Sequence, residues 1–336
     1  MSPFTIRPAH RANVPLVIGL PGPSGSGKTY SALLLARGLA GDGKVVVIDT
    51  EHGRAQMYAD VAAPWSWLDF DAPFSPERYI EALEAAEAQN PAVVVLDSMS
   101  HEYEGDGGLF DIQEEYLQSR AGDDQRKRAA MSFSAWNAAK IRHKKLLAHI
   151  LRMRPHLIVC MRAADKIELI KKDGKLEAIP KRTMTGVEGW EPITERRFPY
   201  ELSASLLMLP SDPGLPKPIK LPEPLRPLVP LDRRLSVETG QRLAKWATGD
   251  KERPMPPAPA GADDGVSSET VDELKLMRAE SGVSDAELRA WVVGLGVEDV
   301  PAKVTLSVMK RLTKHQAVRL RSALSSAIDA RTAEGI

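Results

Sequence analysis

One octapeptide near the N-terminus constrains the fold of this chain more than any other feature. Residues 22–29 read GPSGSGKT and match the pattern G-x-x-x-x-G-K-[ST], which wraps phosphate groups. Its glycines let several backbone N–H groups point inward, and Lys28 is expected to reach the β- and γ-phosphates while the Thr29 hydroxyl binds Mg²⁺. The predicted phosphate-binding residues are Gly22, Pro23, Ser24, Gly25, Ser26, Gly27, Lys28, Thr29 and Tyr30.

The segments on either side of the octapeptide have the sequence that such a loop requires. Residues 14–20 form an apolar run typical of a buried strand, and residues 31–39 have the composition of a helix. A helix at this point directs the positive end of its dipole at the phosphate. The order of strand, loop and helix therefore favours a phosphate site over a Gly/Ser linker that matches by chance.

Two further apolar runs end in acidic residues. Residues 44–49 are followed by Thr-Glu-His, and residues 92–97 end in Asp97. Both runs are typical of strands covered on both faces of a parallel sheet, where ligands collect at the carboxyl ends. We predict that Asp97 holds Mg²⁺ together with Thr29, and that Glu51 orients or deprotonates an attacking water. By position alone, Glu51 could equally belong to a solvated strand end.

These motifs together resemble those of the RecA-like ATPases. GPSGSGKT, VVVIDTEH and VVVLDS follow one another, and in that family a Glu in an Asp-x-Glu-His context is the catalytic carboxylate, a position that Glu51 matches. More narrowly, IDTEHGRAQMYAD, LDSMSHEYEG and a strand that ends in Cys-Met-Arg look like P-loop ATPases of tailed phages. Those proteins are similar to the ATPases that work with single-strand annealing proteins in phage recombination.

The resemblance covers about residues 14–210 and carries several expectations. It implies an α/β fold in which a mostly parallel sheet is flanked by helices, with ATP and Mg²⁺ as cofactors and hydrolysis of ATP to ADP and phosphate. It also implies a homo-oligomer, because the nucleotide of such ATPases sits at a subunit boundary. The host organism would be bacterial, and the protein would act in the bacterial host cytosol.

The sequence departs from the RecA pattern where the strand of residues 156–161 ends. An amide side chain that senses the γ-phosphate is expected there, but the chain has Arg162. Arg162 is a candidate contact to the γ-phosphate in its own subunit or a finger in a neighbouring one, and a solvated charge is the alternative. Lys166 and Lys181 are further candidates for a finger that acts across the subunit boundary.

Composition, proline density and helix-capping residues divide the chain into five segments. They are a polar lead-in, the ATPase core, a Pro-rich extension with a short helix, a flexible linker and an all-helical docking module. In this order the segments are residues 1–13, 14–210, 211–249, 250–265 and 266–336. Ser236 and Gly249 are the predicted start and stop of the short helix, and capping boxes are predicted at Thr270, Ser284 and Thr313.

Composition also excludes several classes of protein. The 336 residues contain 45 Lys plus Arg and 45 Asp plus Glu, so any basic surface must be local. The single cysteine, Cys160, cannot form an intramolecular disulfide, which fits a reducing cytosol. No run approaches the roughly 20 apolar residues that span a bilayer, and the N-terminus lacks a signal-peptide pattern. We therefore expect a cytoplasmic protein with no membrane partner.

Basic residues gather after the third and fourth predicted core strands, where the loops of RecA-like folds face DNA. Between residues 105 and 154, Phe133 and Trp136 lie among Lys and Arg, which suits single-stranded DNA, although the same spacing fits a helix with a solvated basic face. Residues 166–179 alternate around an Asp-Gly turn and predict a hairpin whose lysines either contact DNA or only aid solubility. The DNA-binding candidates are Arg126, Lys127, Arg128, Lys171, Lys172 and Lys175.

Two interpretations from different classes follow from these patterns. The first is an ATPase that acts with single-stranded DNA in phage-type recombination or replication. The alternative is an ATP-switched binding or loading module with little turnover, which docks an annealing or replication protein through its C-terminal helices. A small-molecule kinase fits less well, because the segment after the fourth strand is a Lys-rich hairpin and not an Arg-rich lid. Residues 303–321 contain six Lys or Arg and no acid, and could contact phosphates or an acidic partner.

Overall fold

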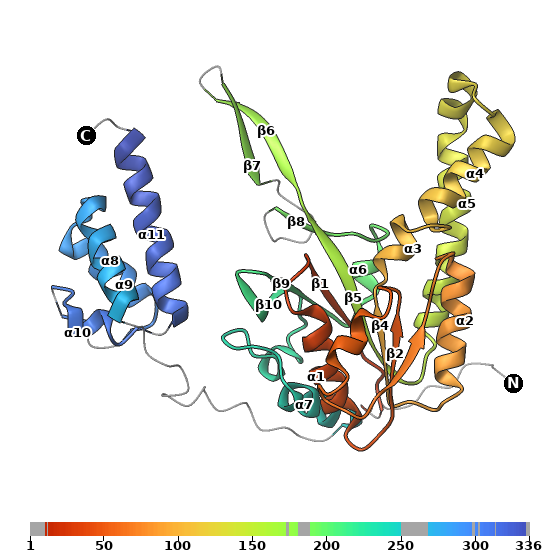
Figure 1. The fold of residues 1–336 in the computed structure, drawn as a ribbon, viewed down its shortest axis with the longest axis horizontal. Coiled ribbons are helices and arrows are strands. Elements are labelled where there is room, and N and C mark those ends of the chain that lie inside the picture. The colour runs from red at the N-terminus through yellow and green to blue at the C-terminus, as the bar shows by residue number, and fades with distance from the viewer. Residues whose placement is uncertain are drawn as a thin grey trace, which may run out of the picture. The chain divides into compact units, whose positions relative to one another are not determined.

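The residues described by the computed structural model form two compact units, one before residue 250 and one after residue 267 (Figure 1). For residues 167–172 and 175–180, the structure describes the backbone but not the side chains. The described residues are 11, 13–172, 175–180, 189–249, 268–297, 300–301, 303–312 and 314–333. The predicted linker of residues 250–265 lies outside them.

A mostly parallel sheet forms the centre of the N-terminal unit. Its eight strands, counted over the described residues, run in the order β10-β9-β1-β5-β4-β2-β3, with β8 paired to β5. Only the β9–β10 and β5–β8 pairs are antiparallel. The strands are β1 Val17–Gly22, β2 Val45–Asp49, β3 Ser66–Asp69, β4 Val93–Asp97, β5 His156–Asp165, β8 Trp190–Pro192, β9 Ala204–Leu209 and β10 Asp212–Lys220.

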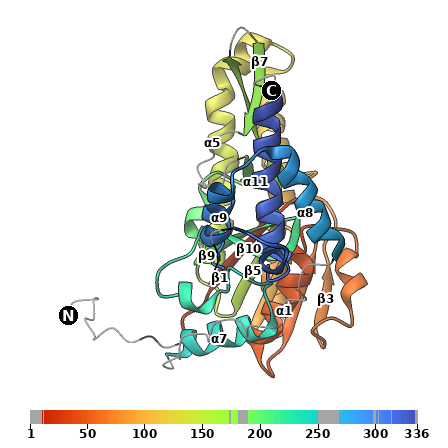
Figure 2. The same cartoon turned by 90° about the vertical axis from the view of Figure 1, so that its left-hand side faces the viewer.

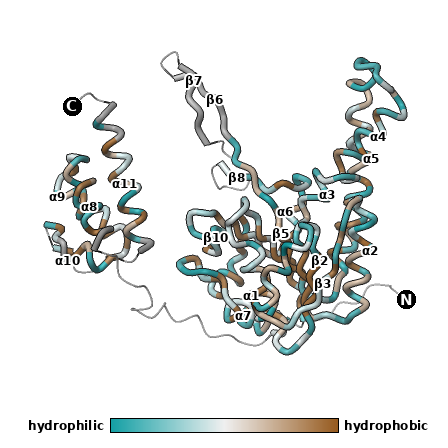
Figure 3. Tube along the Cα trace, viewed as in Figure 1, coloured by the Kyte–Doolittle hydropathy of each residue, from teal (hydrophilic) through white to brown (hydrophobic). Residues whose placement is uncertain are grey.

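Helices cover both faces of this sheet, because its central strands are apolar on both sides. Alternate residues of β1, β2, β4 and β5 enter one of two buried clusters, one under α1 and α7 and the other under α2 and α5. Figure 3 shows hydrophobic residues concentrated in the strands and on the helix faces toward them. The helices are α1 Lys28–Ala40, α2 Pro76–Glu87, α3 Ser100–Glu104, α4 Leu109–Ala121, α5 Gln125–Ile150, α6 Phe198–Glu201 and α7 Val237–Thr248. Short 3₁₀ helices span Arg54–Tyr58 and Arg226–Leu228.

Two hairpins project beyond the sheet (Figure 1 and Figure 2). One is the predicted β-hairpin, confirmed as the antiparallel pair β6 Ile167–Lys172 and β7 Lys175–Pro180, whose turn residues lie outside the described ones. The other is helical and consists of α4 and α5. It occupies the segment that we expected to contain a DNA-facing loop, so the helical alternative for that segment is correct.

Most elements predicted from the apolar runs are confirmed, with shifted ends. The strand predicted from residue 14 begins at Val17, and the strand predicted to end at residue 161 continues to Asp165. β3 was not predicted, because its residues are mostly exposed and make no apolar run. The Pro-rich segment contains no central strand among its described residues, as expected. Its strand β10 lies at the edge of the sheet and pairs irregularly with β9.

Helix α7 has the predicted ends and packs closely on α1. Ser236 caps its N-terminus in a capping box with Thr239, and Gly249 ends it with φ of +95°. The helices cross at Gly38 of α1 and Gly240 of α7, where the two backbones approach each other closely. A Cβ added to Gly38 would lie 2.0 Å from the Val237 carbonyl oxygen, so only glycine fits at this crossing.

The C-terminal unit is all-helical, as predicted, and has a hydrophobic core of its own. Its helices are α8 Ser268–Ser281, α9 Asp285–Gly294, α10 Leu306–Met309 and α11 Lys314–Ala333. The capping box at Ser284 is confirmed, with Glu287 as its partner. The prediction at Thr270 is wrong, because α8 already begins at Ser268, and Thr313 lies outside the described residues. None of the described helices is both long and apolar enough to cross a bilayer.

The crossing of α1 and α7 generates a stability prediction. Gly38→Ala is expected to lower the free energy of unfolding by about 1–3 kcal/mol, because the added methyl group forces the two helices apart. Chemical unfolding followed by circular dichroism measures this change. Gly294→Ala is the control, since a Cβ there meets no atom within 4 Å. Equal unfolding curves for wild type and Gly38→Ala would contradict the packing at this crossing.

Candidate nucleotide-binding site

The predicted phosphate loop connects β1 to α1 with the backbone geometry that the motif requires. Gly25 and Gly27 have φ of +76° and +82°, in the left-handed region that favours glycine. Gly27 is the N-cap of α1, and its carbonyl accepts the first helical hydrogen bond, from the Ser31 amide at 3.0 Å. The N–H groups of the first helical turn therefore face the loop, where an anion would be bound.

Thr29 and Asp97, predicted to share a metal ion, lie in contact. The Thr29 hydroxyl donates a hydrogen bond of 2.5 Å to Asp97 Oδ2, across 68 positions of sequence. Asp97 is the last residue of β4 and is buried. A hydroxyl and a carboxylate oxygen at one point suit Mg²⁺, which prefers oxygen ligands and keeps several waters. The residues present therefore fit the implied cofactor.

Burial sets the charge state of Asp97. Desolvation raises the pKa of its carboxyl to about 6, although the Thr29 hydrogen bond and the Lys28 charge act in the opposite direction. Lys28 Nζ donates to the Pro23 carbonyl at 2.9 Å and so lies over the loop. The site thus contains a buried carboxylate that a bound cation would stabilise in its ionised form.

Glu51 forms a bidentate ion pair with Arg162. Arg162 Nε lies 3.0 Å from Glu51 Oε1, and Nη2 lies 2.9 Å from Oε2. The Glu51 side chain is 15% exposed, and Arg54 Nη1 lies 3.6 Å from its Oε2. Burial alone would raise the pKa of Glu51, but the Arg162 hydrogen bonds and charge lower it below its ordinary value. The carboxylate is therefore ionised and engaged by Arg162.

Asp49, which the sequence analysis did not select, positions Glu51. Its carboxylate accepts hydrogen bonds from the Glu51 amide at 2.7 Å and the Ala55 amide at 3.0 Å. These bonds fold the chain back directly after β2 and hold the turn that carries Glu51. The signal was present in the Asp-x-Glu spacing, because an Asp side chain commonly accepts from the amide two residues on.

A cavity of about 950 Å³ brings the predicted groups together. Lys28, Thr29, Glu51, Asp97 and Arg162 all line it, as do Pro23, Ser24, Gly25, Gly27 and Tyr30. Gly22 and Ser26, also predicted, do not line this cavity: Gly22 ends β1, and Ser26 is buried beneath the loop. Further residues that sequence patterns did not indicate also line the cavity, among them Arg54, Tyr58 and Arg234.

The other predicted residues lie away from this cavity or outside the described chain. Arg126, Lys127 and Arg128 belong to the first turn of α5, at the far end of the helical hairpin (Figure 1). Lys166 is exposed and lines a neighbouring cavity. Lys171, Lys172 and Lys175 belong to β6 and β7, and Lys181 lies outside the described residues.

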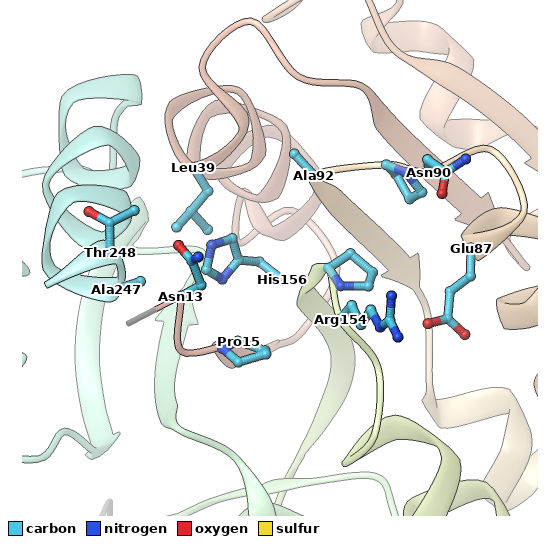
Figure 4. A pocket seen from close by; sticks show the side chains of 12 residues that line it. Asn13, Pro15, Leu39, Glu87, Asn90, Ala92, Arg154, His156, Ala247 and Thr248 are labelled. Carbon is cyan, nitrogen blue, oxygen red and sulfur yellow. The ribbon is translucent and has the colours of Figure 1, made fainter. Parts of the chain in front are cut away.

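A smaller cavity, of about 500 Å³, lies at the amino ends of the strands, away from the loop (Figure 4). His156, which lines it, accepts a hydrogen bond from the Leu16 amide at 3.0 Å through Nδ1. Burial lowers the pKa of His156, so the ring is neutral and serves as a structural acceptor. None of the predicted site residues lines this cavity.

Comparison with known proteins agrees with the geometry of the loop. Residues 15–191, more than half of the chain, match the family described as "AAA domain". Curated proteins gave no match. Among solved structures, a chain described as a unique ATP synthase subunit NeqB from Nanoarcheaum equitans is 13% identical, with 94% of this chain and 70% of that chain covered and a TM-score of 0.36. That score is too low to support an argument. The family match, together with the loop and the Thr29–Asp97 contact, places the chain in the AAA domain family of P-loop nucleotide-binding proteins.

Proposed function

We propose that the protein is a Mg²⁺-dependent ATPase that acts with single-stranded DNA in phage-type recombination or replication. The observation that carries the ATPase part is the hydrogen bond between Thr29 and Asp97, with Glu51 lining the same cavity. An oxygen pair for Mg²⁺, a phosphate loop and a carboxylate for water are the parts that phosphoryl transfer to water needs. The resemblance of the motifs to those of phage ATPases supports the biological setting.

Each residue has a chemical task in this proposal. Lys28 would exchange its hydrogen bond to the Pro23 carbonyl for phosphate oxygens, and the N–H groups of the loop would bind the remaining ones. Thr29 and Asp97 would hold Mg²⁺, which supplies charge neutralisation at the transferring phosphoryl group. Glu51 would orient the attacking water and accept its proton.

The Glu51–Arg162 ion pair must open before Glu51 can act on water. Both carboxylate oxygens accept hydrogen bonds from Arg162, and both residues line the nucleotide cavity. A γ-phosphate in this cavity would offer Arg162 a second anion and would release Glu51. This arrangement supports Arg162 as a γ-phosphate contact in its own subunit more directly than as a finger for a neighbour.

The first test is hydrolysis by variants of the two key residues. Glu51→Gln keeps the shape of the side chain but removes the base, so steady-state hydrolysis should fall by about 100-fold or more while nucleotide binding persists. Lys28→Ala should lose both hydrolysis and nucleotide binding, and it serves as the blank. Hydrolysis of ATP is measured with and without single-stranded DNA. Wild-type rates in Glu51→Gln would remove Glu51 from the mechanism.

The second test uses the pH dependence of kcat/KM. Arg162→Met removes the group that lowers the pKa of a largely buried carboxylate, so the pKa of Glu51 rises. The acidic limb of the pH–rate profile should then move to higher pH. Arg54→Met is the matched control, because Arg54 is 73% exposed and 3.6 Å away, and its removal should shift the limb much less. Equal shifts in the two variants would refute the special role of Arg162.

Helix α5 supports the DNA part of the proposal. It contains seven Lys or Arg and no Asp or Glu. Arg128, Arg142 and Lys140 are paired with acidic residues, at 2.6, 2.7 and 3.6 Å. Arg126, Lys144 and Lys145 are exposed, and Phe133 is 83% exposed between them.

These exposed residues are aligned along the helix. Arg126, Phe133 and Lys144 are separated by 7 and 11 positions, which are close to whole numbers of helical turns. They therefore share one stripe, about 27 Å long at 1.5 Å per residue. Basic groups flanking an exposed aromatic ring suit the phosphates and bases of an unpaired strand.

The third test follows from that stripe. The double variant Lys144→Ala, Lys145→Ala removes Lys144 of that stripe and the exposed lysine next to it. It should weaken binding to an oligo(dT) strand and reduce the dependence of affinity on salt, because fewer counterions are released. Fluorescence anisotropy at several salt concentrations measures both quantities. Lys245→Ala, which removes an exposed lysine of α7, should change neither. An unchanged salt slope in the double variant would exclude these lysines from DNA binding.

The separate core of the C-terminal unit favours a second candidate, an ATP-switched module that loads a partner protein. In this function α8 to α11 would dock an annealing or replication protein, and turnover would be small. Hydrolysis no greater than that of Lys28→Ala, together with partner binding that needs residues 266–336, would favour this candidate. We propose a homo-oligomer for either function, which light scattering with a non-hydrolysable ATP analogue tests.

A further inference from the structure

A second cavity adjoins the candidate nucleotide cavity and is not used by the proposed hydrolysis. Its volume is about 670 Å³, within the range of sites that hold small ligands. Glu104 and Ile193 line both cavities, so the two share a wall. The remaining lining comes from the ends of α3, α4 and β5, from the segment around α6, and from β10.

Aromatic rings form much of this lining. Tyr103, Phe110 and Tyr200 come from three separate elements and meet at the cavity. Phe110 is 42% exposed and Tyr200 is 56% exposed. Tyr103 contacts two other rings: it lies edge-to-face with Phe110 at 4.8 Å and is stacked with Trp136 at 6.5 Å. Exposed rings that gather at a cavity mark a binding site more often than a lone exposed ring does.

The charged groups of the cavity include two exposed basic residues, which suit a ligand that carries an anion. These are Lys166 and Arg196, and Glu104 and Glu191 also line the cavity. Lys220 Nζ donates to the Tyr200 carbonyl at 2.6 Å and holds that segment in place.

We propose that this second cavity takes an unpaired nucleobase of single-stranded DNA. The inference rests on the proposed function with DNA and adds where, and by which residues, a base is held. A base offers a π-face to Tyr103, Phe110 and Tyr200, and the phosphate of its backbone suits the exposed Lys166. An apolar side chain of a partner protein would offer no anion to Lys166.

The shared wall connects this base site to the candidate catalytic carboxylate. The Ile193 amide donates to the Arg162 carbonyl at 2.8 Å, and Ser100 Oγ donates to the Ile193 carbonyl at 2.7 Å. The Arg162 amide in turn donates to Ser100 Oγ at 2.8 Å. A base that presses on Ile193 therefore acts on the part of β5 from which Arg162 holds Glu51. Occupation of the cavity is in this way tied to hydrolysis.

Photocross-linking of the full-length protein to an oligonucleotide with 5-iodouracil in place of thymine tests the inference. The cross-links, mapped by mass spectrometry, are expected at Tyr103, Phe110 or Tyr200. Tyr200→Ala should bind oligo(dT) about tenfold more weakly, with an unchanged salt slope because stacking releases no counterions. Leu231→Ala, at an exposed position away from the cavity, is the control.

The outcomes separate this inference from the proposed function. If wild type binds the oligonucleotide but the cross-links map elsewhere and Tyr200→Ala binds as tightly as wild type, the base site is refuted and the DNA function stands. If wild type does not bind single-stranded DNA, both fail. If Tyr200→Ala keeps its DNA affinity but changes the mass of the oligomer in light scattering, the cavity holds a second copy of the chain and the inference is overturned.

Discussion

The parallel pairing of β1, β5, β4 and β2 determines where every candidate catalytic group lies. In this register Gly22 stands beside Arg162, and Asp97 stands between Asp49 and Cys160, so β1, β2 and β4 end level with residues 160–162 of β5, which itself continues to Asp165. The phosphate loop follows β1, Glu51 follows β2, Asp97 ends β4, and Arg162 lies in β5 at this level. Because the strands are buried on both faces, a shift of register would expose apolar residues, and the site is held by the same burial that stabilises the sheet.

The two carboxyl groups of the site have opposite environments. Asp97 is buried beside a hydroxyl, and burial raises its pKa to about 6, whereas Glu51 has the Arg162 guanidinium against both oxygens and a lowered pKa. Burial disfavours the ionised form of Asp97 and a bound cation would favour it, which agrees with a metal-binding task for Asp97. The Glu51 carboxylate is already paired, so it must lose its contact with Arg162 before it can accept a proton. This agrees with a catalytic role for Glu51 that begins only after the ion pair opens.

The sequence predicted those parts of the site that are local. The loop, Asp97 and Glu51 each follow a recognisable strand, so periodicity and one motif were sufficient to place them. The Glu51–Arg162 pair joins residues 111 positions apart, and the second cavity gathers side chains from several elements, so no local pattern could reveal either. The α4–α5 hairpin was ambiguous, because a basic segment with interleaved aromatic residues fits both a DNA-facing loop and a helix whose apolar side is buried.

Arg162 lies between the two cavities, and this position has a thermodynamic consequence. Its side chain holds Glu51 in the nucleotide cavity, and its backbone is bonded to Ile193, which lines both cavities. If a base in the second cavity favours the arrangement in which Arg162 contacts the γ-phosphate, then ATP must strengthen base binding by the same factor, since coupling between two sites is reciprocal. Release of phosphate would then weaken the binding of single-stranded DNA at the second cavity. A single arginine in β5 can thus connect hydrolysis to the binding of DNA without a large movement of either hairpin.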